Sequence, residues 1–99
     1  MKHLPMKDTN LGRVLRAMHN AAPMSAGHIR RKAGLAPDTA VTARIRDLRK
    51  MGIDVDCQGR RELNEKTVWY YQIERMPQWV SDALREERKR EQQVSGVAA

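Results

Sequence analysis

The sequence predicts an α+β fold in which three short helices precede a β-hairpin and a C-terminal helix. Apolar residues recur with helical spacing over residues 11–48, and from residue 53 to residue 73 they alternate with polar residues as in half-buried strands. Gly34 and Gly52 interrupt these patterns at positions where a helix can end. Together the three observations favour a mixed architecture with a helical first half.

Length and composition set the frame for this architecture. Ninety-nine residues are enough for one domain, expected over residues 1–75, with a C-terminal helix and frayed tail over residues 76–99. The single cysteine, Cys57, excludes a disulfide within the chain and fits a reducing compartment. No apolar run approaches the ~18 residues that span a bilayer, and no signal peptide is visible. We therefore expect a cytoplasmic protein with no membrane partner.

The first helix follows an arm that contains Pro5. Asp8, Thr9 and Asn10 are candidate N-caps, and the helix is expected to end near Asn20. Its apolar face has the spacing i, i+3, i+4 and i+7, with Leu11, Val14, Leu15 and Met18.

The second helix is expected from Ala26 to about Ala33. Pro23 and Met24 form a connector or a minimal edge strand before it, Ser25 can cap it, and Gly34 ends it. A charged, solvated face is one interpretation of its exposed side, and phosphate contact is the other. The residues of that side are His28, Arg30, Arg31 and Lys32.

The third helix is expected over residues 38–51. Pro37 suits its start, Asp38 and Thr39 can cap its first amides, and Gly52 follows its last periodic residue. The apolar face consists of Val41, Ile45 and Leu48.

The opposite side of the third helix has the composition of a surface that enters a DNA major groove. Small residues let the backbone approach the bases, hydroxyls contact bases or phosphates, and arginine can bond guanine through two N–H groups. A solvated helix whose cations complement its dipole is the alternative. The residues on this side are Thr39, Thr42, Ala43, Arg46, Arg49 and Lys50.

The net charge of +7 is distributed unevenly along the chain. Residues 28–50 carry seven Lys or Arg against two Asp, a local charge of +5, and residues 1–27 carry +3. Residues 51–75 carry −1 and residues 76–99 are neutral. Because the excess lies on the two-helix unit and the segment before it, we expect a polyanionic partner rather than a role in solubility alone.

The second half of the domain predicts a hairpin. Residues 53–58 alternate as a short strand in which Cys57 is a small strand residue, residues 59–66 form a polar loop, and residues 67–73 form the second strand. The cations of the loop are Arg60, Arg61 and Lys66. One face of the second strand, expected to pack on the helices, carries Trp69, Tyr71 and Ile73.

Pro77 can open the final helix, whose charged turns are expected to project into water with pairs such as Glu86 and Arg90, and whose tail frays from Val94. The helix has one apolar patch. Two partners remain open for it: a second copy, which would make the chain a homodimer, or the first helix of the same chain. The patch consists of Trp79, Val80, Ala83 and Leu84.

These elements resemble a winged helix-turn-helix. The third helix has the pattern V-x-x-x-I-x-x-L-x-x-x-G, and a hairpin ending in Y-x-I follows it. The segment TARIRDLRKMGIDV resembles small winged-helix proteins of phages and prophages, and it is similar to the recognition helix and wing of ArsR- and MarR-type repressors. The matching positions are Val41, Ile45, Leu48, Gly52, Tyr71 and Ile73.

The resemblance implies that helix 38–51 reads the major groove and that hairpin loop 59–66 lies along the backbone or minor groove. The paired cysteines of metal-sensing ArsR proteins are absent, so no metal or other cofactor is expected. The loop Gly34–Pro37 is one residue longer than in common repressors, which leaves the pose of Asp38 and Thr39 on DNA open.

The expected function is sequence-specific binding of double-stranded DNA by a small, non-enzymatic transcription regulator. The alternative is a non-catalytic adaptor that uses the fold for protein contacts in a phage replication or packaging assembly. RNA binding is a third interpretation, which lacks exposed aromatic platforms beyond Tyr70. The expected DNA contacts are Arg30, Arg31, Thr39, Thr42, Ala43, Arg46, Arg49, Lys50, Arg60, Arg61 and Lys66.

Overall fold

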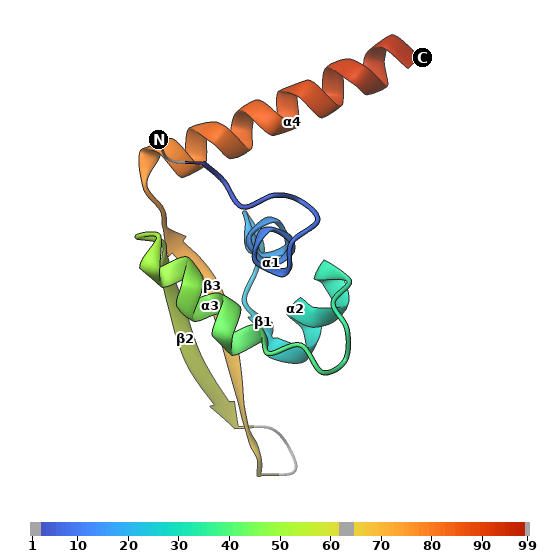
Figure 1. The fold of residues 1–99 in the computed structure, drawn as a ribbon. Helices are drawn as coiled ribbons and strands as arrows, with labels where there is room; N and C mark the ends of the chain where they lie inside the picture. The colour runs from blue at the N-terminus through green and yellow to red at the C-terminus, as the bar shows by residue number, and fades with distance from the viewer. Residues whose placement is uncertain (1–2, 62–64, 99) are drawn as a thin grey trace.

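The computed structural model of the chain describes residues 3–61 and 65–98. Helices α1, α2 and α3 gather beside a β-sheet, the β2–β3 hairpin extends beyond them, and α4 crosses the opposite end of the molecule (Figure 1). The α+β class predicted from the sequence is confirmed. The elements are α1 (Asn10–Met18), β1 (Met24–Ser25), α2 (Ala26–Ala33), α3 (Val41–Lys50), β2 (Asp54–Arg61), β3 (Thr67–Arg75) and α4 (Gln78–Ala98).

The sheet is antiparallel, with its three strands in the order β1-β3-β2. β1 is the minimal edge strand that the sequence left open, and its Met24 pairs with Tyr71 of β3. β2 and β3 pair from Asp54 to Arg61, so the strand continues through residues that were expected in the loop. Each added backbone pair satisfies two peptide groups, which favours the longer strand over an open loop.

One apolar core joins the helices to the sheet. The apolar faces predicted for α1 and α3 contribute to it, although Leu11 is only partly buried, and α2 adds Ile29. Partly buried Tyr71 and Ile73 of β3 pack against the same core. Its buried members are Val14, Leu15, Met18, Met24, Ile29, Val41, Ile45, Leu48, Ile53, Val55, Val80 and Leu84.

The apolar patch of α4 packs within the chain. Val80 is 0% exposed and Leu84 is 3% exposed, Trp79 packs partly buried against the same core, and Ala83 is half-buried. Val80 and Leu84 as contacts with a second copy are therefore a wrong prediction, because this chain already covers both side chains. The intramolecular alternative is the arrangement found.

The remainder of α4 also differs from the prediction. Its backbone is helical to Ala98, where a frayed tail from Val94 was expected; Ala99 lies outside the described residues. Glu87 and Glu91 continue the face of α4 on which the buried apolar residues lie, at i+3 and i+7 from Leu84. That face turns toward α1 and the N-terminal arm, where Glu87 and Glu91 pair with cations. The expected pair of Glu86 with Arg90 does not form among the described residues.

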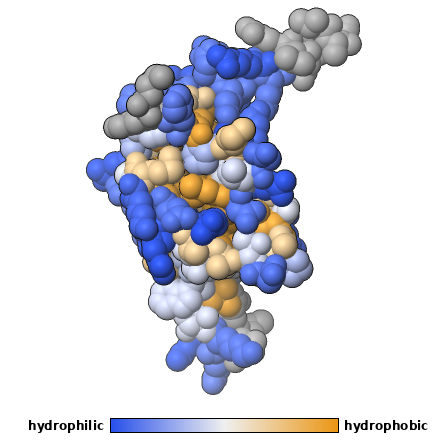
Figure 2. Space-filling view, in the orientation of Figure 1, coloured by the Kyte–Doolittle hydropathy of each residue, from blue (hydrophilic) through white to orange (hydrophobic). Residues whose placement is uncertain are grey.

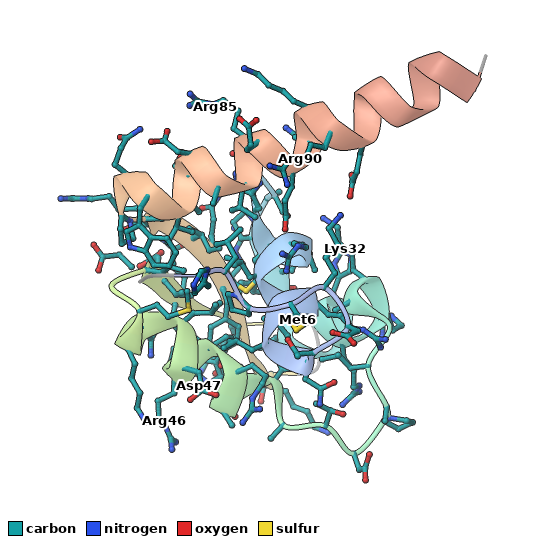
Figure 3. The ribbon with its side chains drawn as sticks, turned by 45° about the horizontal axis from the view of Figure 1, so that its top comes forward. Met6, Lys32, Arg46, Asp47, Arg85 and Arg90 are labelled. Carbon is teal, nitrogen blue, oxygen red and sulfur yellow. The ribbon has the colours of Figure 1, made fainter. Side chains whose placement is uncertain are left out.

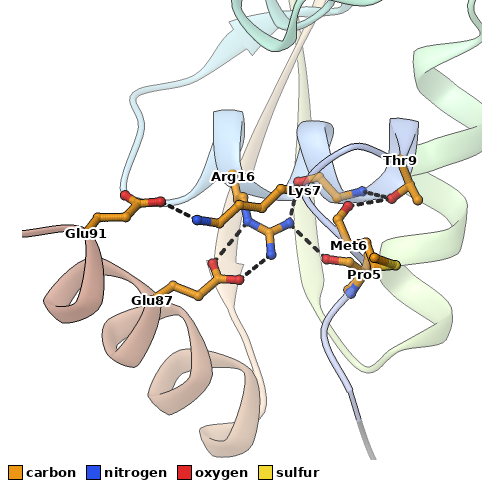
Figure 4. Close-up of polar contacts among 8 residues, drawn as sticks. Pro5, Met6, Lys7, Thr9, Arg16, Glu87 and Glu91 are labelled. Atoms are coloured by element: carbon orange, nitrogen blue, oxygen red, sulfur yellow. Dashed lines mark hydrogen bonds and ion pairs between the residues drawn. The ribbon is translucent and has the colours of Figure 1, made fainter. Parts of the chain in front are cut away.

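Arg16 of α1 holds three segments together (Figure 4). Its Nε and Nη2 donate to the two carboxylate oxygens of Glu87, at 3.1 and 2.6 Å. Its Nη1 donates to the backbone carbonyls of Pro5 and Gly12, both at 3.0 Å. One turn farther along α4, Glu91 pairs with Lys7 of the arm. The arm and α4 are therefore both fixed to α1 through one guanidinium group.

Gly12 explains why the arm can cross α1 so closely. A Cβ at this position would lie 1.9 Å from the carbonyl oxygen of Met6, a distance that no real contact allows. Thr9 completes the crossing, since its hydroxyl accepts from the N–H of Gly12 at 3.0 Å and donates to the Met6 carbonyl at 2.7 Å. Thr9 is thus the N-cap of α1, one of the three caps predicted. α1 ends at Met18, two residues before the expected end.

Candidate nucleic-acid interface

α2 forms as its sequence predicts. The Ser25 hydroxyl accepts from the N–H of His28 at 3.2 Å, and Gly34 ends the helix with a φ of 70°. Glycine adopts this left-handed conformation at low cost. Arg30 is held by its own chain, because its Nη1 donates to the carbonyl of Pro37 at 3.1 Å. Arg30 therefore braces the loop after α2, whereas Arg31 beside it is exposed.

α3 begins three residues later than expected. Its N-cap is Ala40, which has no side-chain acceptor, and neither Asp38 nor Thr39 caps the helix. The N–H of Thr39 instead donates to the carbonyl of Ala36 at 3.0 Å, which closes a turn before the helix. Thr39 consequently lies in the loop, and its predicted place on the exposed face of α3 is wrong.

The late start leaves the first turn of α3 with amides that no side chain caps. Free N–H groups and the helix dipole make such an end favourable for an anion. The end of α3 is defined as predicted: Gly52 has a φ of 88°, and the N–H of Ile53 donates to the carbonyl of Leu48 at 3.2 Å. α3 is therefore shorter than the sequence suggested, with its charge-bearing positions unchanged.

The exposed side of α3 presents Thr42, Arg46, Arg49 and Lys50, while Ala43 is half-buried. In Figure 3 the side chain of Arg46 points away from the body of the protein. Within the described part of the chain, neither Arg46 nor Lys50 forms a hydrogen bond or ion pair. Both cations are therefore available to an external anion.

Other arginines of α3 are engaged. Nη2 of Arg49 donates to the backbone carbonyl of Val55 in β2 at 3.0 Å, which fixes α3 against the strand. Arg44, on the other flank of the helix, forms an ion pair of 3.3 Å with Asp47. A guanidinium that already holds a backbone carbonyl or a carboxylate has fewer donors left for phosphate. Arg46 is thus the better candidate for a base or phosphate contact.

The hairpin is longer than the helix beside it. β2 returns along α3 from the Gly52 turn, and its eight residues span about 26 Å, whereas the ten residues of α3 span about 15 Å. The far end of the hairpin therefore extends roughly 10 Å past the N-terminus of α3. Figure 1 shows this extension at the lower end of the molecule.

The cations of the hairpin divide between its two faces. Arg60 and Arg61 lie in β2, not in the predicted loop, and successive side chains of a strand point to opposite faces. The guanidinium of Arg60 lies 4.9 Å from the ring centroid of Tyr70, on the outer face. Arg61 has the same parity as Val55, whose side chain is buried, so it lies on the face turned toward α3. Lys66 is exposed beyond the strand end.

Trp69 is the residue that the sequence placed wrongly. It was expected to pack on the helices with Tyr71 and Ile73, but it is 54% exposed. The face of β3 on which Trp69 lies was predicted correctly. The hairpin is longer than predicted, however, and Trp69 lies beyond the N-terminal end of α3. Cys57 on the paired strand is exposed as well, although the alternation placed it on the apolar face with Ile53 and Val55. The hairpin thus carries an exposed aromatic platform in addition to Tyr70, which was the one expected from the sequence.

These placements define a surface that we call the α3–hairpin corner, formed by α3 from Thr42 to Arg46 and the inner face of the projecting hairpin. Some predicted contacts lie elsewhere. Lys50, at the other end of α3, lines a cavity with residues of the arm and α4. Lys32 of α2 points in a direction opposite to Arg46 in Figure 3. The corner is defined by Thr42, Arg46, Arg61 and Trp69.

A second surface surrounds the far end of α3. The cavity there has a volume of about 700 Å³ and is mostly apolar, and Met6 at its rim is 69% exposed. Figure 2 shows hydrophobic residues gathered in the middle of the molecule, between hydrophilic residues of α4 and of the hairpin end. The cavity is lined by His3, Leu4, Pro5, Met6, Thr9, Leu11, Lys50, Met51 and Trp79.

Among the described residues, His19, Tyr71 and Glu91 have a shifted pKa. Burial, and then the charge of Arg88, lowers the pKa of His19. Burial, with a smaller effect of Cys57, raises the pKa of Tyr71 above its ordinary value. The hydrogen bond from Lys7 lowers the pKa of Glu91.

No protein-family model, curated protein or solved structure matches the chain. Over residues 3–61 and 65–98, no helix combines the length and the apolar character of a membrane-spanning segment. The described side chains also include no group of three or more His, Cys, Asp or Glu residues arranged to hold a metal ion.

Proposed function

We propose that the chain is a winged helix-turn-helix protein that binds double-stranded DNA in a sequence-specific way, as a small non-enzymatic transcription regulator of phage or prophage type. In this proposal α3 enters the major groove and the β2–β3 hairpin is the wing. The observation that carries the proposal is Arg46: an arginine on the exposed face of α3 that points away from the protein with no partner among the described residues.

The charge on and around α3 supports the same partner. Residues 28–50 carry most of the excess positive charge, and the first turn of α3 has no side-chain cap. Phosphate contacts from cations and from helix N-termini position a protein on DNA, while base contacts specify sequence. Arg46 has the reach to bond a base edge through two N–H groups, and Thr42 precedes it by one turn. Arg31 and Arg61 are the accompanying candidates for phosphate contact.

The adaptor function is the second candidate, and one observation favours it. The apolar cavity between the arm, α3 and α4 has an exposed rim at Met6, and exposed apolar surface is typical of protein contacts. This surface lies at the C-terminal end of α3, away from the projecting end of the hairpin. An adaptor would therefore use a different face from the one that DNA would occupy, so variants can separate the two functions.

A salt titration on duplex DNA tests the proposal. Neutralisation of about four to six phosphates gives a log–log slope of roughly −4 to −5 for the binding constant against salt concentration. Fluorescence anisotropy with a labelled random duplex, starting at ~50 mM salt, measures this slope. Arg31→Ala should reduce its magnitude by about one. Arg85→Ala, on the exposed side of α4, is the matched control and should leave it unchanged. Absence of binding at low salt would reject DNA and favour the adaptor.

A further inference from the structure

Trp69 presents an aromatic ring to solvent at the projecting end of the hairpin. With 54% of its surface exposed, it is one of two large hydrophobic residues so exposed in the described chain, and the other, Met6, lies by the apolar cavity. Its indole N–H forms no hydrogen bond with any part of the chain that the structure describes. Neither core packing nor a local hydrogen bond accounts for a tryptophan at this position.

The ring is held in place from one side. Gly59 pairs directly with Trp69 across the strands, and a Cβ at position 59 would lie 2.9 Å from Cζ3 and 3.2 Å from Cε3 of the indole. The same Cβ would lie 3.1 Å from the methyl group of Thr67. The indole therefore lies across the bare backbone of Gly59, in space that any other side chain would occupy. The strand supports the ring while much of its surface stays open.

The surroundings of the ring are cationic. Arg61 follows Gly59 by two residues, so it lies on the same face of β2 and diagonally beside Trp69. Arg46 on the exposed side of α3, the helix that β2 returns along, points away from the protein without a partner among the described residues (Figure 3). A supported aromatic ring beside unpaired cations is the combination that stacks a nucleobase and neutralises its phosphate. A protein partner would gain from the ring but would have to match these cations with acids.

An intact duplex offers Trp69 no base face, because its bases are stacked on each other. A base that is bulged out, mismatched or next to a strand end has an accessible face. We infer that Trp69 stacks on such an unpaired base, so that the chain prefers duplex DNA with an extrahelical base beside the bound segment over uniform duplex. This inference rests on the proposed function and adds a substrate class to it.

The test uses the full chain with Trp79→Phe, which leaves Trp69 as its single tryptophan. Three hairpin-closed DNA duplexes of one sequence serve as probes: one fully paired, one with a single extra adenine, and one with an abasic residue in place of that adenine. DNA anisotropy gives the affinities at ~50 mM salt, where nonspecific electrostatic binding is strong. Tryptophan emission reports stacking directly, without a variant of Trp69.

The adenine bulge should bind about 5- to 100-fold more tightly than the paired duplex, the range that base–aromatic stacking provides. The adenine should quench Trp69, and the abasic residue should not. Trp69→Ala should equalise the three affinities, Trp69→Phe should retain part of the preference, and Arg60→Ala, on the outer face, should keep it.

Equal affinities without adenine-dependent quenching, together with salt-dependent binding to all three probes, would overturn the inference and leave the proposed function intact. Equal quenching by the paired duplex and the bulge would also overturn it, because Trp69 would then contact a groove. No binding to any probe would reject the proposed function itself, and the inference with it.

Discussion

Arg16 and Glu87, which are 71 positions apart in the sequence, form a two-bonded ion pair that is largely withdrawn from solvent. Their side chains are 20% and 28% exposed, respectively. Arg16 also donates to the Pro5 carbonyl, so a single side chain connects the arm, α1 and α4. The pair lies apart from the proposed DNA surface, which makes its contribution to stability measurable without interference from binding.

Arg16→Ala should lower the free energy of unfolding by about 1–3 kcal/mol, because it leaves the Glu87 carboxylate and the Pro5 carbonyl partly buried without a donor. Glu87→Gln should cost less, since the amide oxygen can still accept one hydrogen bond. Urea unfolding of both single variants and the double variant gives their coupling. Glu91→Gln is the control, because its pair with Lys7 is well exposed and should change the melting temperature little. Additive losses for Arg16 and Glu87 would contradict the pairing.

Gly12→Ala tests whether the arm crosses α1 closely, because a close crossing decides whether this substitution raises or lowers the stability of the fold. In a helix interior, Ala is normally more stable than Gly by about 1 kcal/mol. Here the new Cβ would collide with the Met6 carbonyl, so the variant should be destabilised and its arm displaced. Gly27→Ala in α2 is the matched control, since the nearest atoms to its Cβ would be arginine nitrogens at 3.7 and 3.9 Å. Stabilisation of both variants in thermal melts would refute the close crossing.

His19 should make stability fall on acidification. Burial, followed by the charge of Arg88, lowers the pKa of His19 below 6.5, so the unfolded chain binds a proton at this site more readily than the folded chain. Its contribution is therefore fully present above the unfolded value and is lost as the pH falls below about 6.5. His19→Gln should reduce the decrease in melting temperature between pH 7.5 and pH 5.5. If the decrease in melting temperature is the same in this variant, other groups cause it. His28→Gln is the control at an exposed site.

Arg46→Ala should separate sequence reading from general attraction. If Arg46 bonds a base edge, its loss should weaken binding to a selected site by about 1–3 kcal/mol and relax the preference at one base pair. Arg61→Ala, at the hairpin, should weaken selected and random DNA more evenly. Site selection from a random library followed by competition binding measures both effects. Equal losses on the two DNAs for Arg46→Ala would show that α3 does not read sequence.

Leu84→Glu should lower stability without changing the association state. Leu84 is buried in the core of its own chain, so a carboxylate there should cost a few kcal/mol, about the penalty of other disrupted core positions. Sedimentation of the wild type and of the variant, with a melting curve for each, checks both parts. A variant that melts like the wild type but sediments as a monomer where the wild type is a dimer would show that Leu84 contacts a second copy.

The helical half of the fold could be predicted because its signals are local. The face formed by Val41, Ile45 and Leu48, the Ser25 cap and the left-handed Gly34 are each determined by a few neighbouring residues. The beginning of α3 could not be predicted the same way. Three residues, Asp38, Thr39 and Ala40, can precede a helix there, and the turn closed by the Ala36 carbonyl selects the one with the weakest capping side chain.

The candidate site was predictable in composition and not in geometry. The sequence identified Arg46, Arg49 and Arg61, but it could not show that Arg49 donates to the backbone of β2 while Arg46 points away from the protein. Trp69 was assigned to the correct face and the wrong environment. Alternation along a strand predicts which side a residue takes, whereas burial depends on where the neighbouring helix ends.

The closure of α4 onto α1 also has a kinetic consequence. A contact across 71 positions requires a long loop to close, which costs more entropy than the local turns that join α1, α2 and α3. We expect α4 and the arm to dock late in folding and to open first under native conditions, as a unit whose release leaves the other helices assembled. The bonds of the Arg16 guanidinium then hold this unit closed, and they break when the chain partially unfolds.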